Sequence, residues 1–346
     1  MKTKQIVAIG LIVLLVFSLV YTGCQSDPLP PVKPDKPKKA EVIPPDFNED
    51  SSYVYIQKQV AFGPRVPNNA SHTKCGDWLE AKLKSYGASV IAQRAPITSR
   101  DGKTIEIRNI IAQYQPEKKK RILLCAHWDT RPVADKDPNA AMRNKAIDGA
   151  NDGASGVGVL LEIARQLQQK PCDFGVDIIF FDAEDNGSIE GADETEDFDH
   201  PGFQSTWCLG SQYWAKNKLP QGYSAQYGIL LDMVGAADAE FNKEATSMQH
   251  AGDVMNLVWN TAAKLGYNNY FINEEVNGVT DDHSFVNQAG IRCIDIIDTR
   301  PETAAMGLGR FQFGPYHHTH NDNIDIIDKN TLNAVGQTVL QVIYNL

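Results

Sequence analysis

The sequence has few cysteines and no pair of them spaced to hold a metal. The 346 residues include six cysteines, and no two of them form a CxxC motif, which is a common spacing in thiolate metal sites. If Cys24 is modified as described below, the remaining cysteines are odd in number, so any disulfide scheme leaves at least one unpaired. A metal site built from cysteines is therefore not expected.

Positive charge is also scarce. The 43 acidic residues outnumber the 33 basic residues, which gives a formal net charge of −10 and a pI near 5.3. Because a polyanion would be repelled at long range, nucleic acid is excluded as a partner and an anionic membrane surface is disfavoured. With 42% hydrophobic residues, the chain can bury one large core.

The N-terminus carries an apolar run over residues 6–20, preceded by Lys2 and Lys4, which is typical of a secretory signal. The run ends near Thr22-Gly23-Cys24, and small residues before a cysteine resemble a bacterial lipobox. We expect a signal peptide over residues 1–23 and lipidation of Cys24, with an uncleaved membrane anchor as the alternative. Both arrangements predict a protein of the bacterial cell envelope, held at the membrane and facing the periplasm or the cell surface.

The rest of the chain divides into a tether and one domain. Residues 24–50 are rich in proline and lysine, a composition that stays extended. We expect a single catalytic domain over residues 51–346. Short apolar runs at 121–126, 176–181, 227–231 and 291–296 predict strands, and segments 75–86, 155–169, 253–265, 282–288 and 331–343 predict helices. This alternation predicts an α/β sheet with helices on both faces.

Polar residues follow three of the predicted strands. His127 and Asp129 come after the first, Glu184 and Asp185 after the second, and Asp232 after the third. Because ligands gather at the carboxyl ends of strands in open α/β sheets, we expect these side chains to meet in one crevice.

Two further candidates are Asp152, in the glycine-rich segment 149–156, and His318, in the histidine-rich segment 317–320. Imidazole and carboxylate donors without thiolate are typical of catalytic zinc, which keeps one position open for substrate. A carboxylate beside a ligand, as in Glu184 next to Asp185, places a general base within reach. Taken alone, each motif also has a structural interpretation, such as a helix cap at Asp152. The ordered combination favours a zinc site.

Eight segments together carry a resemblance to a known family. From about Val60 to Leu346 the chain resembles the zinc aminopeptidase family and, more closely, its non-proteolytic branch, the glutaminyl-peptide cyclotransferases (glutaminyl cyclases). The resemblance implies a three-layer α/β sandwich with a mixed, mostly parallel central sheet. The segments are FGPRVP (62–67), RNII (108–111), AHWD (126–129), GAND (149–152), FFDAED (180–185), LLDMVGA (230–236), DDH (281–283) and HTHNDN (318–323).

The resemblance to the cyclases implies one zinc ion held by Asp152, Asp185 and His318. It makes Glu184 the acid that shuttles a proton. The reaction would convert the N-terminal glutamine of a peptide or protein to pyroglutamate and release ammonia.

Further positions follow from the same resemblance. Asp232 and Asp282 match two carboxylates of a hydrogen-bonded network with the acid and the substrate. Trp207 or Trp128 would form an apolar wall around the new ring, with an ordinary core position as the alternative for both. The chain departs from the family at Asp185, where many relatives have glutamate, and at His317, where animal cyclases have tryptophan.

The main alternative is an aminopeptidase with two zinc ions. His127 and Asp232 match the second-metal ligands of that branch, Asp152 would bridge the ions, and Glu184 would activate a water for hydrolysis. A third possibility is a binding module that has lost its metal, against which the intact acid and ligand set argue.

Overall fold

The computed structural model describes residues 42–188, 205–301 and 311–345. The predicted signal peptide and Cys24 lie outside this part of the chain. Within it, no helix is both long and apolar enough to cross a membrane.

The main sheet of the described residues has six strands in the order β1-β2-β4-β3-β5-β8. Four of these strands run parallel to one another. They are β4 (Gly175–Phe181), β3 (Arg121–His127), β5 (Gly228–Asp232) and β8 (Cys293–Ile297). At one edge, β1 (Ser89–Thr98) pairs with β2 (Thr104–Tyr114), and β2 pairs with β4, both in the antiparallel sense. The mixed, mostly parallel sheet is thus confirmed, and its parallel strands are the four predicted ones.

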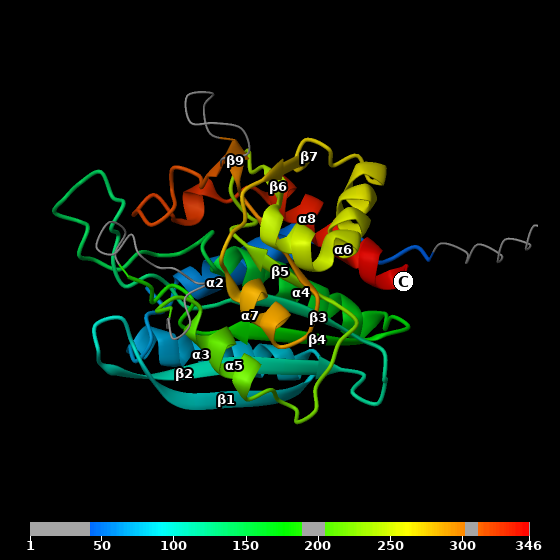
Figure 1. Ribbon diagram of the computed structural model, residues 1–346, viewed down its shortest axis with the longest axis horizontal. Helices are drawn as coiled ribbons and strands as arrows, with labels where there is room; N and C mark the ends of the chain where they lie inside the picture. The colour runs from blue at the N-terminus through cyan, green and yellow to red at the C-terminus, as the bar shows by residue number, and fades with distance from the viewer. Residues whose placement is uncertain (1–41, 189–204, 302–310, 346) are drawn as a thin grey trace, which may run out of the picture. The chain divides into compact units, whose positions relative to one another are not determined.

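Helices cover both faces of this sheet, because alternate residues of the buried strands point to opposite sides. In β3, Ile122 and Leu124 join one apolar cluster, while Leu123 and Cys125 join another. The second cluster contains residues of α5 (Leu209–Lys216) and α7 (Asp282–Gln288), which lie in front of the sheet in Figure 1. The first cluster contains residues of α2 (Glu49–Val60), α3 (Ala70–Ser85), α4 (Ala154–Gln169), α6 (Ala245–Lys264) and α8 (Lys329–Tyr344).

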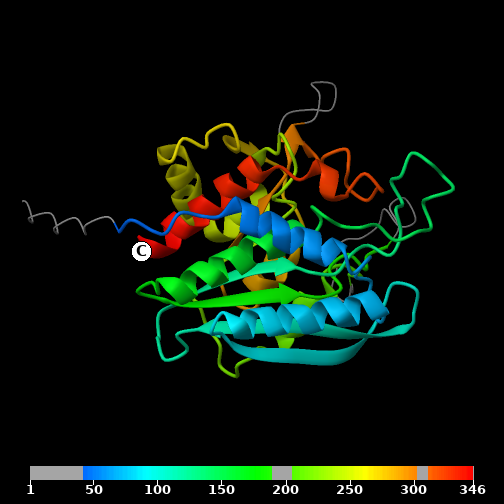
Figure 2. The same ribbon diagram turned by 180° about the vertical axis from the view of Figure 1, so that it is seen from behind.

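Figure 2, the view from the opposite side, shows α2, α3 and α4 covering the other face of the sheet. The three-layer sandwich is thus confirmed. Smaller elements complete the domain. They are the parallel pair β6 (Phe241–Glu244) and β7 (Phe271–Val276), the antiparallel pair β9 (Arg300–Pro301) and β10 (Phe311–Gln312), and the 3-10 helix η1 (Ile324–Ile326).

The folded unit begins at Val42 rather than at residue 51. Val42 N donates to Asn345 Oδ1 at 2.6 Å, and the Phe47 side chain is buried. Asn48 caps α2 by accepting from Ser51 N at 2.7 Å. The end of the predicted tether therefore belongs to the domain, because this stretch contains an apolar anchor and a helix cap despite its proline-rich surroundings.

The parallel strands bring their following loops to one edge of the sheet. β3 ends at His127, β4 at Phe181 and β5 at Asp232. At the same edge, α4 begins so close to β3 that a Cβ on Gly153 would lie 2.5 Å from His127 Nε2. This close approach requires glycine there and brings the preceding Asp152 beside the strand ends.

Candidate active site

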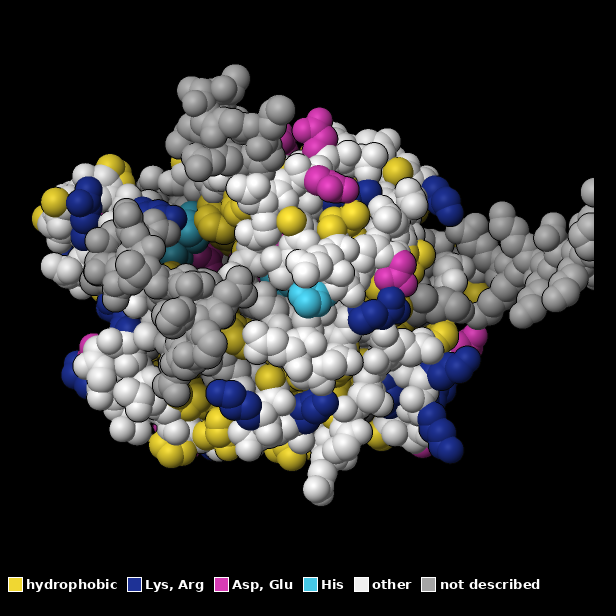
Figure 3. Space-filling view, in the orientation of Figure 1, with side chains coloured by type: hydrophobic (Ala, Val, Ile, Leu, Met, Phe, Trp, Pro, Cys, Tyr) yellow, Lys and Arg dark blue, Asp and Glu magenta, His cyan; other side chains and the backbone are white. Residues whose placement is uncertain are grey.

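A cavity of about 220 Å³ opens at the carboxyl ends of the strands. In Figure 3, histidine and acidic atoms are visible inside a hollow that hydrophobic side chains border. The cavity is lined by Asp152, Glu184, Asp185, Trp207, Asp232, Met233, Val279, Thr280, Asp281, Ile297, Phe313, His317 and His318.

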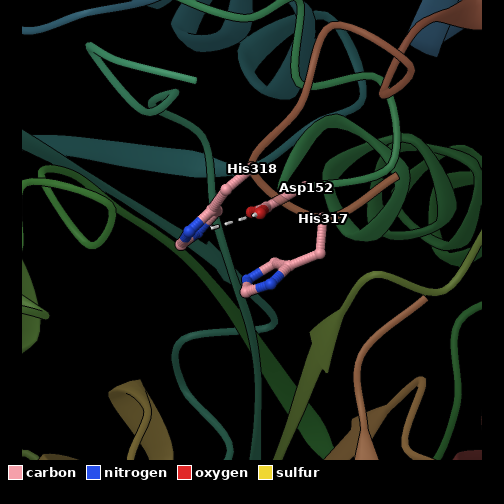
Figure 4. Close-up of side chains that lie close together, drawn as sticks. All are labelled: Asp152, His317 and His318. Atoms are coloured by element: carbon pink, nitrogen blue, oxygen red, sulfur yellow. Dashed lines mark ion pairs between the residues drawn. The ribbon is translucent and has the colours of Figure 1, made fainter. Parts of the chain in front are cut away.

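The three predicted zinc ligands meet in this cavity. His318 Nε2 lies 3.2 Å from Asp185 Oδ1 and 3.8 Å from Asp152 Oδ2, and Figure 4 shows the side chains of Asp152 and His318 facing one another, with His317 beside them. Donors bound at zinc distances in a tetrahedral site are about 3.3 Å apart. Asp185 Oδ2 is buried and accepts no hydrogen bond from the described residues. These donors fit a metal ion, and the possible ligand atoms of Asp152, His317 and His318 also lie within 4.8 Å of one another.

The pKa of His318 supports the same interpretation. Burial lowers it well below its usual value, and the positive charges of Arg131 and Lys136 add to the effect. A neutral imidazole has the lone pair that a metal ligand must offer.

The His127 ring lies among a second group of carboxylates. Its Nε2 lies 3.0 Å from Asp152 Oδ1 and 3.1 Å from Asp232 Oδ1, and its Nδ1 lies 3.4 Å from Asp129 Oδ1. Burial opposes protonation, but the bonds to these carboxylates outweigh it and raise the pKa of His127 well above its usual value.

Two buried aspartates hold the backbone of the ligand loops. Asp129 accepts from Glu184 N at 3.1 Å and from Asp185 N at 3.3 Å. Asp322 accepts from Asn151 N at 2.7 Å and from Asp152 N at 3.1 Å. Both lay in motifs of the sequence, but only their contacts show that they position the neighbouring acid and ligands.

Glu184 faces the cavity between these groups. Its Oε1 lies 3.1 Å from the thiol of Cys208. Desolvation in the cavity raises the pKa of Glu184 well above its usual value, and the negative charge of Asp281 adds to the effect. Such a carboxyl group is suited to take up and return a proton.

Asp282, which by the resemblance matches a carboxylate of the network, does not itself line the cavity. Asp282 is fully buried in the first turn of α7, whereas Asp281, the N-cap of that helix, lines the cavity wall. Burial raises the pKa of Asp281 to about 6, with a contribution from the charge of Asp232. Burial likewise raises the pKa of Asp232 to about 6. Asp281 is therefore the carboxylate that can act beside Glu184.

The two tryptophans differ in position. Trp207 lines the cavity and stacks on His318, with ring centroids 5.8 Å apart and an interplanar angle of 8°. Trp128 does not line the cavity and takes the core position that was the alternative for both tryptophans. Trp128 is fully buried, stacks on His72 at 4.2 Å and donates from Nε1 to Arg108 O at 3.1 Å. Trp128 can be buried in the core because its indole N–H donates a hydrogen bond to the backbone.

Sequence reasoning missed most of the apolar wall. Met233, Val279, Ile297 and Phe313 line the cavity beside Trp207. These side chains have no sequence signal of their own, because isolated apolar residues near strand ends are also typical of an ordinary core.

Comparison with known proteins agrees with this architecture. Residues 109–343 match the family model described as peptidase family M28. The structure of a Bacteroides thetaiotaomicron glutaminyl cyclase bound to N-acetylhistamine is 50% identical, covers 88% of this chain and 100% of its own, and gives a TM-score of 0.81.

Two other matches are described as peptidases. A Zn-dependent exopeptidase from Parabacteroides distasonis is also 50% identical over 88% of this chain and 100% of its own, with a TM-score of 0.81. Aminopeptidase YwaD of Bacillus subtilis is 26% identical over 84% of this chain. The matched region covers only 56% of the length of that aminopeptidase. Because the family model covers most of the folded domain, the chain belongs to peptidase family M28.

Proposed function

We propose that this chain is a zinc-dependent glutaminyl-peptide cyclotransferase, which converts the N-terminal glutamine of peptides or proteins to pyroglutamate. The observation that carries the proposal is the 50% identity with a solved glutaminyl cyclase over 88% of the chain and the whole of that structure. The cavity supports it, because one cluster of metal ligands lies beside a proton-carrying acid and an apolar wall.

Asp152, Asp185 and His318 would hold one zinc ion, which supplies Lewis-acid polarisation of the γ-carboxamide carbonyl when bound. Glu184 accepts a proton from the α-amine as the amine nitrogen forms its bond to the carbonyl carbon (Cδ) of the side-chain amide. The bond from that carbon to the amide nitrogen then breaks, and Glu184 returns the proton to the departing ammonia.

Water takes no part in this reaction. The apolar side chains of Trp207, Met233, Val279, Ile297 and Phe313 limit its access to the reacting carbon. Asp281 lies close enough to Glu184 for their carboxylate oxygens to fall within 4.8 Å. Two acids at this separation disfavour double ionisation, which helps one of them to hold the proton between the two transfers.

A two-zinc aminopeptidase is the second candidate. The observation that favours it is the grouping of His127, Asp152 and Asp232, whose possible ligand atoms all lie within 4.8 Å of one another. With a second ion held there, Glu184 would activate a water for amide hydrolysis.

Mass spectrometry of a glutamine-leading peptide after incubation with the zinc-loaded protein distinguishes the two. Loss of ammonia with unchanged chain length supports the cyclase, and release of the first amino acid supports the aminopeptidase. Zinc content measured on the same sample should be one ion per chain for the cyclase and two for the aminopeptidase.

We also propose that the protein is lipid-anchored through Cys24 in the bacterial cell envelope, so that its substrates are exported peptides or proteins. The support is the signal-like residues 1–23 followed by the proline-rich tether. Labelling with a fatty acid should mark the protein and should be lost in Cys24→Ala. Labelling that persists in this variant would rule out Cys24 as the lipidated residue.

A further inference from the structure

A second hollow adjoins the catalytic cavity. It has a volume of about 390 Å³, and it shares Phe313 and His317 with the catalytic cavity. The part that extends beyond the catalytic cavity is lined by Lys136, Phe311, Gln312, Gly314, Pro315 and Thr319. The two spaces are therefore neighbours, with the side chains of Phe313 and His317 lining both.

The wall of the second hollow is largely aromatic. Phe311 and Phe313 are half-buried and pack edge to face, with ring centroids 5.2 Å apart and an interplanar angle of 65°. The ring of Phe313 also packs against His317, at a centroid distance of 4.5 Å. Partly exposed aromatic rings in a hollow leave apolar surface that a ligand side chain can cover.

The polar contact at the junction of the two spaces has a fixed direction. Lys136 Nζ lies 2.8 Å from His317 Nδ1. A lysine ammonium only donates, so Nδ1 accepts, and the ring hydrogen of His317 is on Nε2. His317 thus offers one N–H donor, and a peptide carbonyl is the natural acceptor for it at this place.

The geometry points to this hollow as the subsite for the residue that follows the N-terminal glutamine, with a preference for a large apolar or aromatic side chain. This inference rests on the proposed function, because a substrate held by its first residue must continue out of the cavity. The side chain of the second residue packs on Phe311 and Phe313, and a main-chain carbonyl of the peptide accepts from His317 Nε2. Lys136 acts as a positioning residue, because its hydrogen bond to His317 Nδ1 keeps the ring hydrogen of His317 on Nε2.

The test compares kcat/KM for glutamine amide, Gln-Gly-amide and Gln-Phe-amide with the zinc-loaded protein. We expect Gln-Phe-amide to exceed Gln-Gly-amide by about tenfold, mainly through KM, as burial of an aromatic ring predicts. Phe311→Ala should reduce this ratio to about twofold and leave glutamine amide unchanged. Phe62→Ala is the matched control, because Phe62 is a half-buried aromatic that packs on Trp78 outside both cavities.

Two further variants keep the test decisive if Phe311→Ala does not fold. Gln312→Trp, at an exposed position of the hollow, should fill it and abolish the preference. Lys136→Met should raise KM for both dipeptide amides by about fivefold relative to KM for glutamine amide, without changing the ratio between the two dipeptide amides, as loss of one ordered hydrogen bond predicts.

The outcomes separate this inference from the proposed function. If none of the three substrates is cyclised, the proposed function fails. If they are cyclised but Gln-Phe-amide and Gln-Gly-amide react equally, or if their ratio survives both hollow variants, the subsite assignment is wrong.

Discussion

Replacing Glu184 by glutamine should separate catalysis from metal binding. Glutamine has the same shape and keeps an oxygen for the Cys208 thiol, which lies 3.1 Å from Glu184 Oε1, but it cannot carry a proton at neutral pH. In the proposed reaction Glu184 moves the proton twice, and a positioned acid or base contributes about 10²–10⁴-fold. We expect kcat to fall by about 10⁴-fold, which corresponds to about 5.4 kcal/mol of transition-state free energy.

The same substitution should not destabilise the fold. Desolvation in the cavity and the charge of Asp281 raise the pKa of Glu184, so the folded protein holds its proton more tightly than the unfolded chain does. Stability is therefore lost as the pH rises from the pKa of the unfolded chain to the raised pKa of the folded protein, by about 1.4 kcal/mol for each pH unit between the two. Since glutamine carries no charge, the metal-free variant should be more resistant to urea than the metal-free parent at neutral pH.

The assay is ammonia release from a glutamine peptide, with zinc content measured on the same samples. Glu106→Gln, on the exposed side of β2, is the matched control and should retain full activity. If Glu184→Gln retains zinc and its kcat stays within about tenfold of the parent, another group carries the proton and the assigned role of Glu184 is wrong.

Three other substitutions test separate parts of the structure. His318→Ala should lose zinc on dialysis, whereas full retention would transfer the ligand role to His317 or His320. Phe47→Ala should lower the free energy of unfolding by about 3 kcal/mol, because it leaves a cavity in a buried site against α8. An unchanged urea midpoint would mean that residues 42–50 are part of the tether and not of the folded domain. Glu244→Gln should cost about 3 kcal/mol at neutral pH. The imidazole of His283, whose Nε2 lies 3.4 Å from Glu244 Oε1, and hydrogen bonds from backbone N–H groups overcome the effect of burial and lower the pKa of Glu244 to about 2. That difference from the parent should disappear as the pH falls from about 4.5 to 2, and a difference that does not change with pH would contradict it.

The parallel half of the sheet could be predicted because each of its strands is a short apolar run that is buried on both faces. β3 and β4 are fully buried along their length, and such strands show as continuous hydrophobic segments. β1 and β2 were missed because they mix exposed and buried residues at the edge of the sheet. α2 was missed because its sequence lies next to the proline-rich segment, and its position depends on packing against α4 and α8.

The candidate site shows the same division. The order of polar residues after the strands was enough to nominate Glu184, Asp185 and Asp232, because parallel strands end at one edge of a sheet. Asp152 and His318 were nominated by the glycine-rich and histidine-rich segments that contain them. The sequence was not enough to choose between adjacent aspartates at the start of α7. Successive residues at a helix N-terminus point in different directions, so only the packed position of α7 shows that Asp281, and not Asp282, lines the cavity.

The sequence by itself determined the fold class, the family resemblance and the chemical character of the metal site, since these depend on local hydrophobic pattern and on residue type. The tertiary structure decided which side chains line the cavity. Trp128 and Trp207 are alike as residues, but one is buried against His72 and the other stacks on His318 in the cavity wall. Burial and contact depend on segments distant in the chain, and these distances are set only when the sheet and its two helical layers pack together.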